Sequence, residues 1–313
     1  MNETTVRPGA TQHLESTGFA ITFLGAILFS TKAVIVKFAF RNTPMDALTL
    51  LMLRMTFSLP FYVVAAWMAG TKKGIRPLTS RQWSYVIFLG LFGYYLSSLF
   101  DFVGLQYVSA GLERLILFLY PSFAVLINAI VFRQSVSKVQ RWALLLTYTG
   151  IGIAYFGELQ FDFSNPNFLW GSFLIFLCSI TFSVYIVGSG RSIPSVGVTR
   201  FTAYAMLTST FGVFVHFAIA GNRQALLQAS HFWWYGILLA VVATVLPTFM
   251  LSSGMKRIGS NNVAIVSSVG PVSTIIQAHF IIGEKIFWEQ VVGTVLVVGG
   301  VLLIGRQGVK KVE

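Results

Sequence analysis

Five ionisable side chains lie inside long apolar segments of this chain, and they are the residues best placed to do chemistry. They are Lys32, Arg54, Asp101, Glu113 and Arg114. A charge at the centre of a membrane helix costs about 2.5–3.5 kcal/mol on insertion scales, so these groups should face a polar cavity or one another. Basic groups in such a cavity bind carboxylates or phosphates, whereas acidic groups bind an amino group or carry a proton.

Lys32 and Arg54 carry most of the binding prediction. Lys32 lies about eight residues from the outer end of its segment, roughly 12 Å at the helical rise, so we expect it to face the cavity rather than snorkel to the surface. For Arg54 two interpretations stay open: contact with the substrate, or a structural clamp on broken helix ends.

Glu113 and Arg114 are adjacent and therefore point about 100° apart on a helix. Glu113 shares a face with Tyr120, so we assign it to the cavity and expect Arg114 to pair with a neighbouring helix. Asp101 shares a face with Tyr94 and either contacts the substrate or satisfies Arg114. The predicted substrate-binding residues are Lys32, Arg54, Glu113, Tyr120 and Tyr94, with Asp101 and Arg114 as a coupling group or ion pair.

The segments that hold these residues must be membrane helices. The 313 residues are 55% hydrophobic and 10% charged, whereas a soluble domain averages about 25% charged. Apolar blocks near the bilayer-spanning length of roughly 20 residues recur along the chain. We predict an all-α, polytopic membrane protein with spans at about 18–40, 46–69, 83–103, 110–132, 140–157, 169–189, 200–220, 233–253, 260–282 and 287–305.

Four prolines fall within these spans and free backbone carbonyls, either to bend helices around a cavity or as simple kinks: Pro60, Pro121, Pro247 and Pro271.

The distribution of basic residues predicts the orientation. With the N-terminus in the cytoplasm, 15 Lys and Arg residues would lie on that side and only Arg41, Arg223 and Lys285 on the other. We therefore expect a multi-pass membrane protein with both termini cytoplasmic. The net charge of +12 comes from short tracts between apolar blocks, which argues against a nucleic-acid partner.

The chain repeats itself at a displacement of 150 residues. Gly104, Pro121 and Gly150 recur as Gly254, Pro271 and Gly300. Five spans per copy is an odd number, so the second copy must enter the membrane from the opposite side, giving an inverted repeat. We predict a polar tail at 1–17, five-helix repeats at 18–157 and 168–305, and a second tail at 306–313.

The second repeat lacks the buried charges. The positions equivalent to Lys32, Arg54, Asp101, Glu113 and Arg114 are Phe182, Tyr204, Leu251, Val263 and Ala264. Since both copies build the same helices, the fold alone does not require the charges. They are therefore the best functional candidates in the chain.

Several motifs resemble the EamA-type, ten-helix members of the drug/metabolite transporter superfamily. They are FSTKAVIVK ending at Lys37, Arg54 within LLMLRMTFS, the two Gly…Pro copies, and Gly283–Glu284. The resemblance implies an inner-membrane carrier, often an exporter of amino acids, metabolites or toxic compounds. The chain departs from the pattern at Gln134, where the second copy has Glu284, and at Lys32, where many members carry a small or amide residue.

These features predict a secondary transporter of a small metabolite by alternating access; the alternative is a non-transporting receptor or structural membrane protein. No metalloprotease, P-loop, Rossmann or nucleophile-elbow pattern occurs, so we expect no enzyme activity, no catalytic residues, no cofactor and no metal. The single cysteine, Cys178, excludes an internal disulfide. The expected partners are a small-molecule substrate and the lipid bilayer, and glycines on helix faces allow a homodimer.

Overall fold

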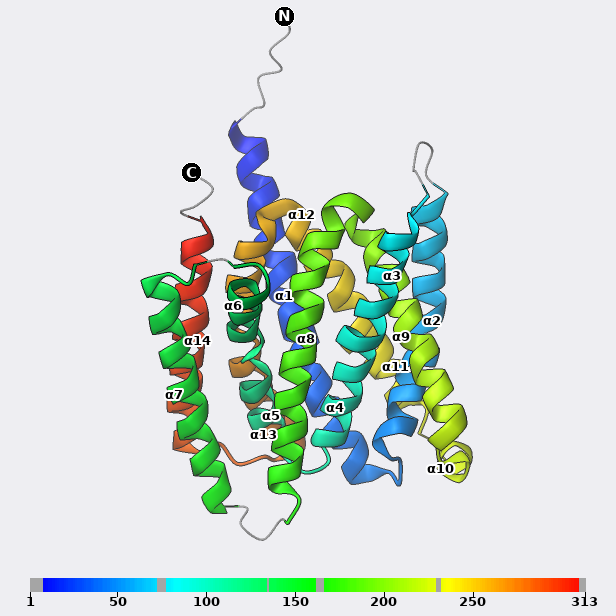
Figure 1. The fold of residues 1–313 in the computed structure, drawn as a ribbon. Coiled ribbons are helices and arrows are strands. Elements are labelled where there is room, and N and C mark those ends of the chain that lie inside the picture. The colour runs from blue at the N-terminus through cyan, green and yellow to red at the C-terminus, as the bar shows by residue number, and fades with distance from the viewer. Residues whose placement is uncertain (1–7, 72–76, 134, 162–165, 229–231, 310–313) are drawn as a thin grey trace, which may run out of the picture.

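The computed structural model describes residues 8–71, 77–133, 135–161, 166–228 and 232–309. All regular secondary structure in these ranges is helical. The first half contains α1 (Pro8–Asn42), α2 (Ala47–Gly70), α3 (Ser80–Phe88), the π-helix η1 (Leu89–Tyr95), α4 (Leu96–Gly104), α5 (Ala110–Leu117), α6 (Tyr120–Val131) and α7 (Lys138–Phe161). The second contains α8 (Phe168–Val196), α9 (Val198–Ala220), α10 (Arg223–Gln228), α11 (Trp234–Ala240), the π-helix η3 (Val241–Val245), α12 (Leu246–Ser267), α13 (Gly270–Ile282) and α14 (Trp288–Val309) (Figure 1).

The helices match the predicted membrane class. Within the described residues, seven helical segments are long and apolar enough to cross a membrane, judged by length and composition, and two shorter apolar helices follow. The remaining predicted span, 140–157, lies in α7, which is helical throughout but does not reach that level of apolar character. Residues Gln134 and Asp162, the basic loop at 72–76 and both chain ends lie outside the described residues.

Polar residues set the starts of several helices. The Asp46 side chain accepts the Thr49 N–H at 2.7 Å ahead of α2, and Thr79 and Gln82 form a reciprocal capping box ahead of α3. Such caps satisfy backbone donors that a helix start leaves unpaired.

Two of the four prolines lie at helix starts rather than at kinks. The predicted span 110–132 is two helices, α5 and α6, and Pro121 stands in the first turn of α6. Pro271 takes the same place in α13. A proline is tolerated there because its missing N–H has no intrahelical partner. Pro60 does lie inside α2, as predicted.

The predicted break between the spans 233–253 and 260–282 is absent, because α12 is helical from Leu246 to Ser267. The first half restarts at Ser109, whose side chain accepts the Leu112 N–H. In the second half no new helix begins at the equivalent place. The chain therefore turns at the upper end of Figure 1 without leaving the helix.

Helix boundaries follow the 150-residue displacement closely. The starts of α4, α6 and α7 become those of α12, α13 and α14, and the end of α5 becomes that of α12. Helix α2 at 47–70 corresponds to α9 at 198–220. The displacement read from the sequence is thus a structural repeat.

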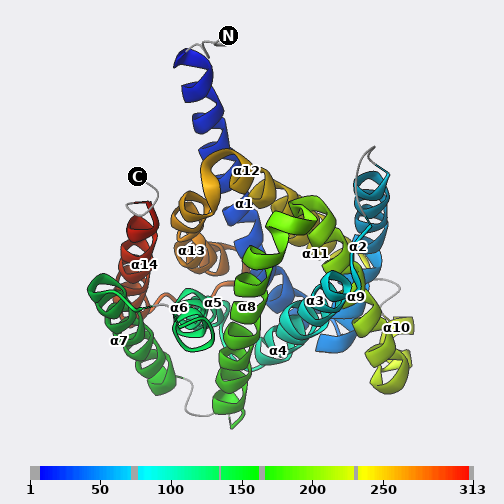
Figure 2. The same cartoon turned by 45° about the horizontal axis from the view of Figure 1, so that its top comes forward.

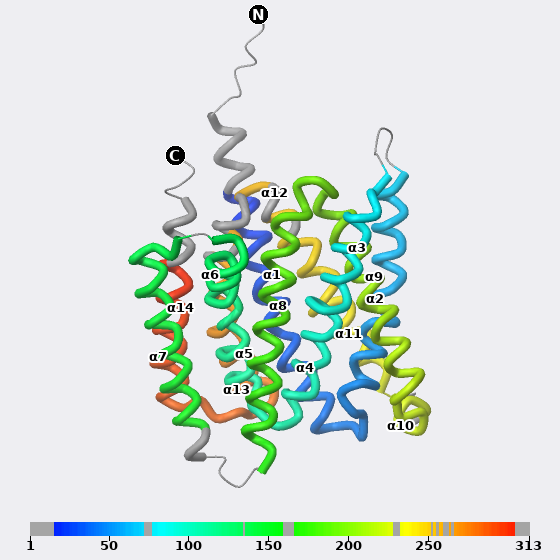
Figure 3. The backbone as a smooth tube through the Cα atoms, in the orientation of Figure 1, coloured from blue at the N-terminus to red at the C-terminus, as the bar shows by residue number. Residues whose placement is uncertain are grey.

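The two repeats pack crosswise. In the first repeat η1 packs on α8 and α9, and in the second η3 packs on α1 and α2. Likewise α4 packs on α8, while α12 packs on α1. Figure 3 traces α8 passing beside α3 and α4 of the other repeat. Each repeat therefore completes the core of the other.

Helices α7 and α14 lie side by side at one edge of the bundle (Figure 2). A Cβ added to Gly150 would lie 2.6 Å from the Gly293 carbonyl oxygen, and one added to Gly300 would lie 2.7 Å from the Ala143 carbonyl oxygen. Ala143 corresponds to Gly293, and Gly150 to Gly300, so these contacts are copies of each other. Gly150 pairs with Gly293 and Ala143 pairs with Gly300, so residue numbers rise along one helix as they fall along the other. The two helices are therefore antiparallel, as an inverted repeat requires.

This close approach gives a test of the fold. We expect Gly150→Ala to lower the melting midpoint of the detergent-purified protein by several degrees, because overpacking costs about 1–3 kcal/mol. Gly152→Ala is the matched control, since nothing lies within 4 Å of its added Cβ. Equal midpoints for the two variants would contradict the contact.

Candidate functional site

The centre of the bundle holds an ion cluster formed by three helices. The Lys32 Nζ of α1 lies 2.6 Å from an Asp101 carboxylate oxygen of α4 and 3.5 Å from a Glu113 carboxylate oxygen of α5. The three residues are 6%, 1% and 0% exposed. Buried charges persist only when paired, so the three side chains must be treated as one unit.

Arg114, the next residue of α5, has partners of its own. Its guanidinium donates to Ser30 Oγ of α1 at 3.2 Å and lies over the rings of Phe29 and Phe118. Gly270 permits this position, because an added Cβ would come within 2.9 Å of the guanidinium. Glu113 and Arg114 thus point to different partners on α1, which is what their helical spacing predicts.

Arg54 of α2 is surrounded by hydroxyl groups. Its Nε donates to Thr244 Oγ1 at 2.9 Å, one terminal nitrogen donates to Tyr94 Oη at 3.0 Å, and the other lies 3.5 Å from Ser98 Oγ. The guanidinium also lies over the Tyr94 and Phe102 rings. No carboxylate of the described residues forms an ion pair with it.

A small cavity of about 30 Å³ lies between these groups. That is the volume of about one water molecule. It is too small for a metabolite, so the structure is closed around its charged centre. Its lining residues come from both repeats: Phe29, Lys32, Arg54, Tyr94, Ser97, Ser98, Asp101, Leu117, Cys178 and Phe182.

The predicted residues are distributed as follows. Lys32, Arg54, Tyr94 and Asp101 line the cavity, and Glu113 joins it through Lys32. Tyr120, at the start of α6, is not among the lining residues, and its ring packs against Phe118 and Phe182. Ser30, Ser98 and Thr244 hold the guanidinium groups and were missed. The repeat could have indicated Thr244, because it stands 150 residues after Tyr94.

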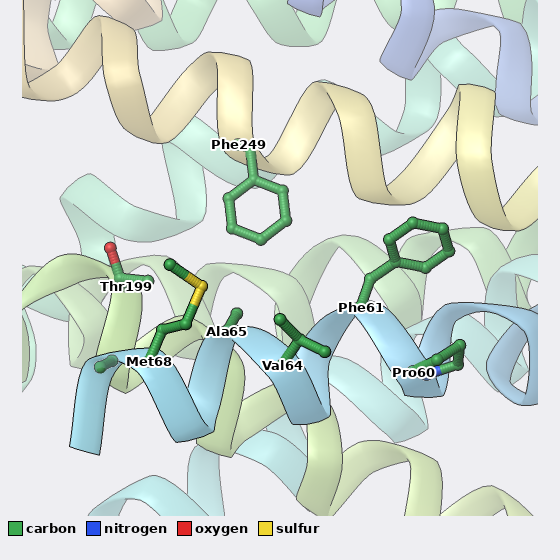
Figure 4. Close-up of a pocket in the computed structure, with 8 residues that line it drawn as sticks. Pro60, Phe61, Val64, Ala65, Met68, Thr199 and Phe249 are labelled. Carbon is green, nitrogen blue, oxygen red and sulfur yellow. The ribbon is translucent and has the colours of Figure 1, made fainter. Parts of the chain in front are cut away.

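A larger pocket lies elsewhere and is apolar. About 510 Å³ in volume, it lies on the side of the bundle between α2, α9 and α12 (Figure 4). It contains no charged side chain, and Phe61 and Met68 on its rim are exposed. It lacks the groups needed to recognise a polar solute, so the central cavity remains the candidate site.

A second carboxylate cluster caps α5 at its N-terminus. Glu158 accepts hydrogen bonds from the Ser109 N–H and hydroxyl and from Gln290, while Glu284 accepts the Ala110 N–H at 3.1 Å. Carboxylates at a helix N-terminus stabilise it. Glu158 comes directly after the predicted span 140–157 and is buried within α7.

Comparison with known proteins places the chain in a family. The model of the EamA-like transporter family matches residues 16–156 and 169–306. A crystal structure of a protein with 17% sequence identity has the same fold, with a TM-score of 0.64 over 92% of this chain and 97% of that one.

Two relatives are transporters. The uncharacterized transporter YcbK of Bacillus subtilis is 30% identical over 296 residues, which cover 92% of this chain and 91% of that protein. The biotin transporter of Escherichia coli K12 is 24% identical over 209 residues, covering 65% of this chain and 68% of that protein. Two family matches over most of the chain, and a full-length relative at this identity, show that it is a membrane transporter of the EamA-like transporter family.

Proposed function

We propose that the protein is a secondary transporter of a small metabolite that carries a carboxylate, such as an amino acid or organic acid. The central ion cluster is its substrate site. Transport proceeds by alternating access, and export is the direction that the family resemblance implies.

The charge balance of the site carries this proposal. Lys32, Arg54 and Arg114 supply three positive charges, whereas Asp101 and Glu113 supply two negative charges. If all five are ionised, one buried positive charge has no opposite charge to balance it. A carboxylate entering the cavity would supply the missing charge.

Lys32 is the group that we assign to the substrate carboxylate. In the closed structure its ammonium lies between Asp101 and Glu113. An incoming carboxylate would draw the Lys32 ammonium away from both acidic side chains. Asp101 and Glu113 could then bind a substrate amino group or carry a coupling proton. Tyr94 and Tyr120 would border the bound solute.

The name of one relative is consistent with such a substrate. The biotin transporter of Escherichia coli is named for a solute that bears one carboxylate. At 24% identity we extend only the chemical class to this chain, not the solute.

We further propose that the protein lies in the inner membrane with both termini in the cytoplasm, because 15 of the 18 basic residues between spans would lie on that side. The start of α1 and the end of α14 do share one end of the bundle (Figure 1).

The orientation is tested with an epitope tag at each terminus. Proteases should remove both tags from inside-out vesicles and neither from intact spheroplasts. Removal of either tag from spheroplasts would contradict the proposed orientation.

Removal of the Lys32 charge should abolish transport. In proteoliposomes we expect Lys32→Ala to reduce uptake of the transported carboxylate at least tenfold, while Lys285→Ala, at an exposed position, retains it. Because Lys32→Ala also leaves Asp101 unpaired, the double variant Lys32→Met with Asp101→Asn should regain thermal stability without regaining transport. Unchanged uptake kinetics in Lys32→Ala would remove Lys32 from the mechanism.

The substrate class is tested by thermal stabilisation. A bound ligand at 100 times its Kd stabilises a protein by about 2.7 kcal/mol. We expect some amino or organic acids, and no neutral sugars, to raise the melting midpoint of the wild type but not that of Lys32→Met. A carboxylate that binds but never crosses the bilayer would instead favour a receptor.

A further inference from the structure

The third membrane helix of each repeat contains a π-helical turn at the equivalent place. In the first repeat η1 ends at Tyr95, and in the second η3 ends at Val245, which is 150 residues later. Small residues also recur at these turns: Gly93 and Ala243 are equivalent and lie within them, and Gly90 of η1 is equivalent to Ala240 at the end of α11. π-Turns are rare and concentrate at functional sites. Two of them at matched positions indicate a feature of the repeat itself.

One side chain joins the two turns. Arg54 donates to Tyr94 in η1 and to Thr244 in η3, at 3.0 and 2.9 Å. These two acceptors are themselves 150 residues apart and therefore occupy the same position in the two repeats. The guanidinium lies between equivalent points of two inverted halves.

The bond to Thr244 reaches the backbone of its turn. While its oxygen accepts the Arg54 Nε–H, the Thr244 hydroxyl donates to the Leu239 carbonyl oxygen at 2.8 Å, five residues earlier. In the other turn Tyr94 packs its ring edge-on against Tyr185 of α8. A movement of either π-turn would therefore strain the contacts of Arg54.

Three of the five N–H groups of the guanidinium are directed at hydroxyl groups of the protein. Each of its three nitrogens faces a hydroxyl oxygen, and its planar surface lies over the Tyr94 and Phe102 rings. The side chain is 3% exposed. All of its acceptors are neutral, so no ion pair fixes it to one repeat.

We propose that Arg54 is a positioning residue that links the π-turns of the two repeats and holds the bundle closed. The inference rests on the proposed alternating-access function and adds the part that must break when the cavity opens. Opening requires one repeat to move against the other, and the bond between Arg54 and Thr244 crosses between them. Arg54 acts through the two turns and does not itself bind substrate.

The native Cys178 provides the measurement. It is the only cysteine of the chain, it lines the central cavity, and it is buried. The rate at which maleimide alkylates it in purified protein therefore reports how often the cavity opens. We expect Tyr94→Phe and Thr244→Val each to raise this rate roughly tenfold. A hydrogen bond to a charged group contributes at least the free energy that corresponds to a tenfold change in an equilibrium constant.

Non-additivity distinguishes a link from two separate contacts. Both hydroxyl groups hold the same guanidinium, so the double variant Tyr94→Phe with Thr244→Val should raise the rate by less than the product of the two single effects. Thr244→Ser keeps the hydroxyl and should react like the wild type. Ser97→Ala should also be neutral, because Ser97 lines the cavity but its hydroxyl bonds to the Tyr94 carbonyl.

Three results would overturn the proposal. The first is a double variant whose alkylation rate rises by the product of the two single effects. The second is that neither single variant changes the alkylation rate of folded, monodisperse protein. The third is an Arg54→Lys variant whose transport KM rises while its maximal rate is kept, since that indicates contact with substrate. The alkylation assay uses no substrate, so failure to find a transported carboxylate would refute the proposed substrate class and leave this inference standing.

Discussion

The structure depends on keeping five ionisable groups out of water in the middle of a helical bundle. Their burial is tolerated because Lys32 pairs with Asp101 and Glu113, and because hydroxyl groups and aromatic rings surround Arg54 and Arg114. Such an arrangement is costly and adds little stability compared with apolar packing. The second repeat shows that the fold does not need these charges, since it forms the same helices with apolar or neutral residues at those positions.

The asymmetry of charge on a symmetric scaffold explains how the two halves divide their tasks. The first repeat supplies the ion cluster, whereas the second supplies the walls around it, including Cys178 and Phe182 of α8. Crosswise packing brings this about, because α4 and α5 of the first repeat lie against α8 of the second. A site built this way is shared between the two repeats.

Much of this could be predicted from the sequence. The 150-residue displacement predicted a repeat, which the helix boundaries follow, and the cost of intramembrane charge indicated Lys32, Arg54, Asp101 and Glu113, which the structure brings together. Hydropathy could not predict that α12 is continuous. It could not predict the burial of Glu158 either, because that burial depends on the contacts of its carboxylate with Ser109 and Gln290. The π-turns also left no hydropathy signal, because they change the hydrogen-bond register and not the polarity.

The contact between α7 and α14 pairs two helices that occupy the same place in the two repeats. Ala143 faces Gly300 and Gly150 faces Gly293, so exchanging the two halves returns the same set of contacts. In the language of oligomers this interface is isologous. Under the proposed alternating-access mechanism, the two halves exchange conformations and the geometry of this interface stays the same. It would then be a fixed contact while the other helices rearrange. Two separate five-helix chains could therefore form an antiparallel dimer through the same surface and would need no new interface.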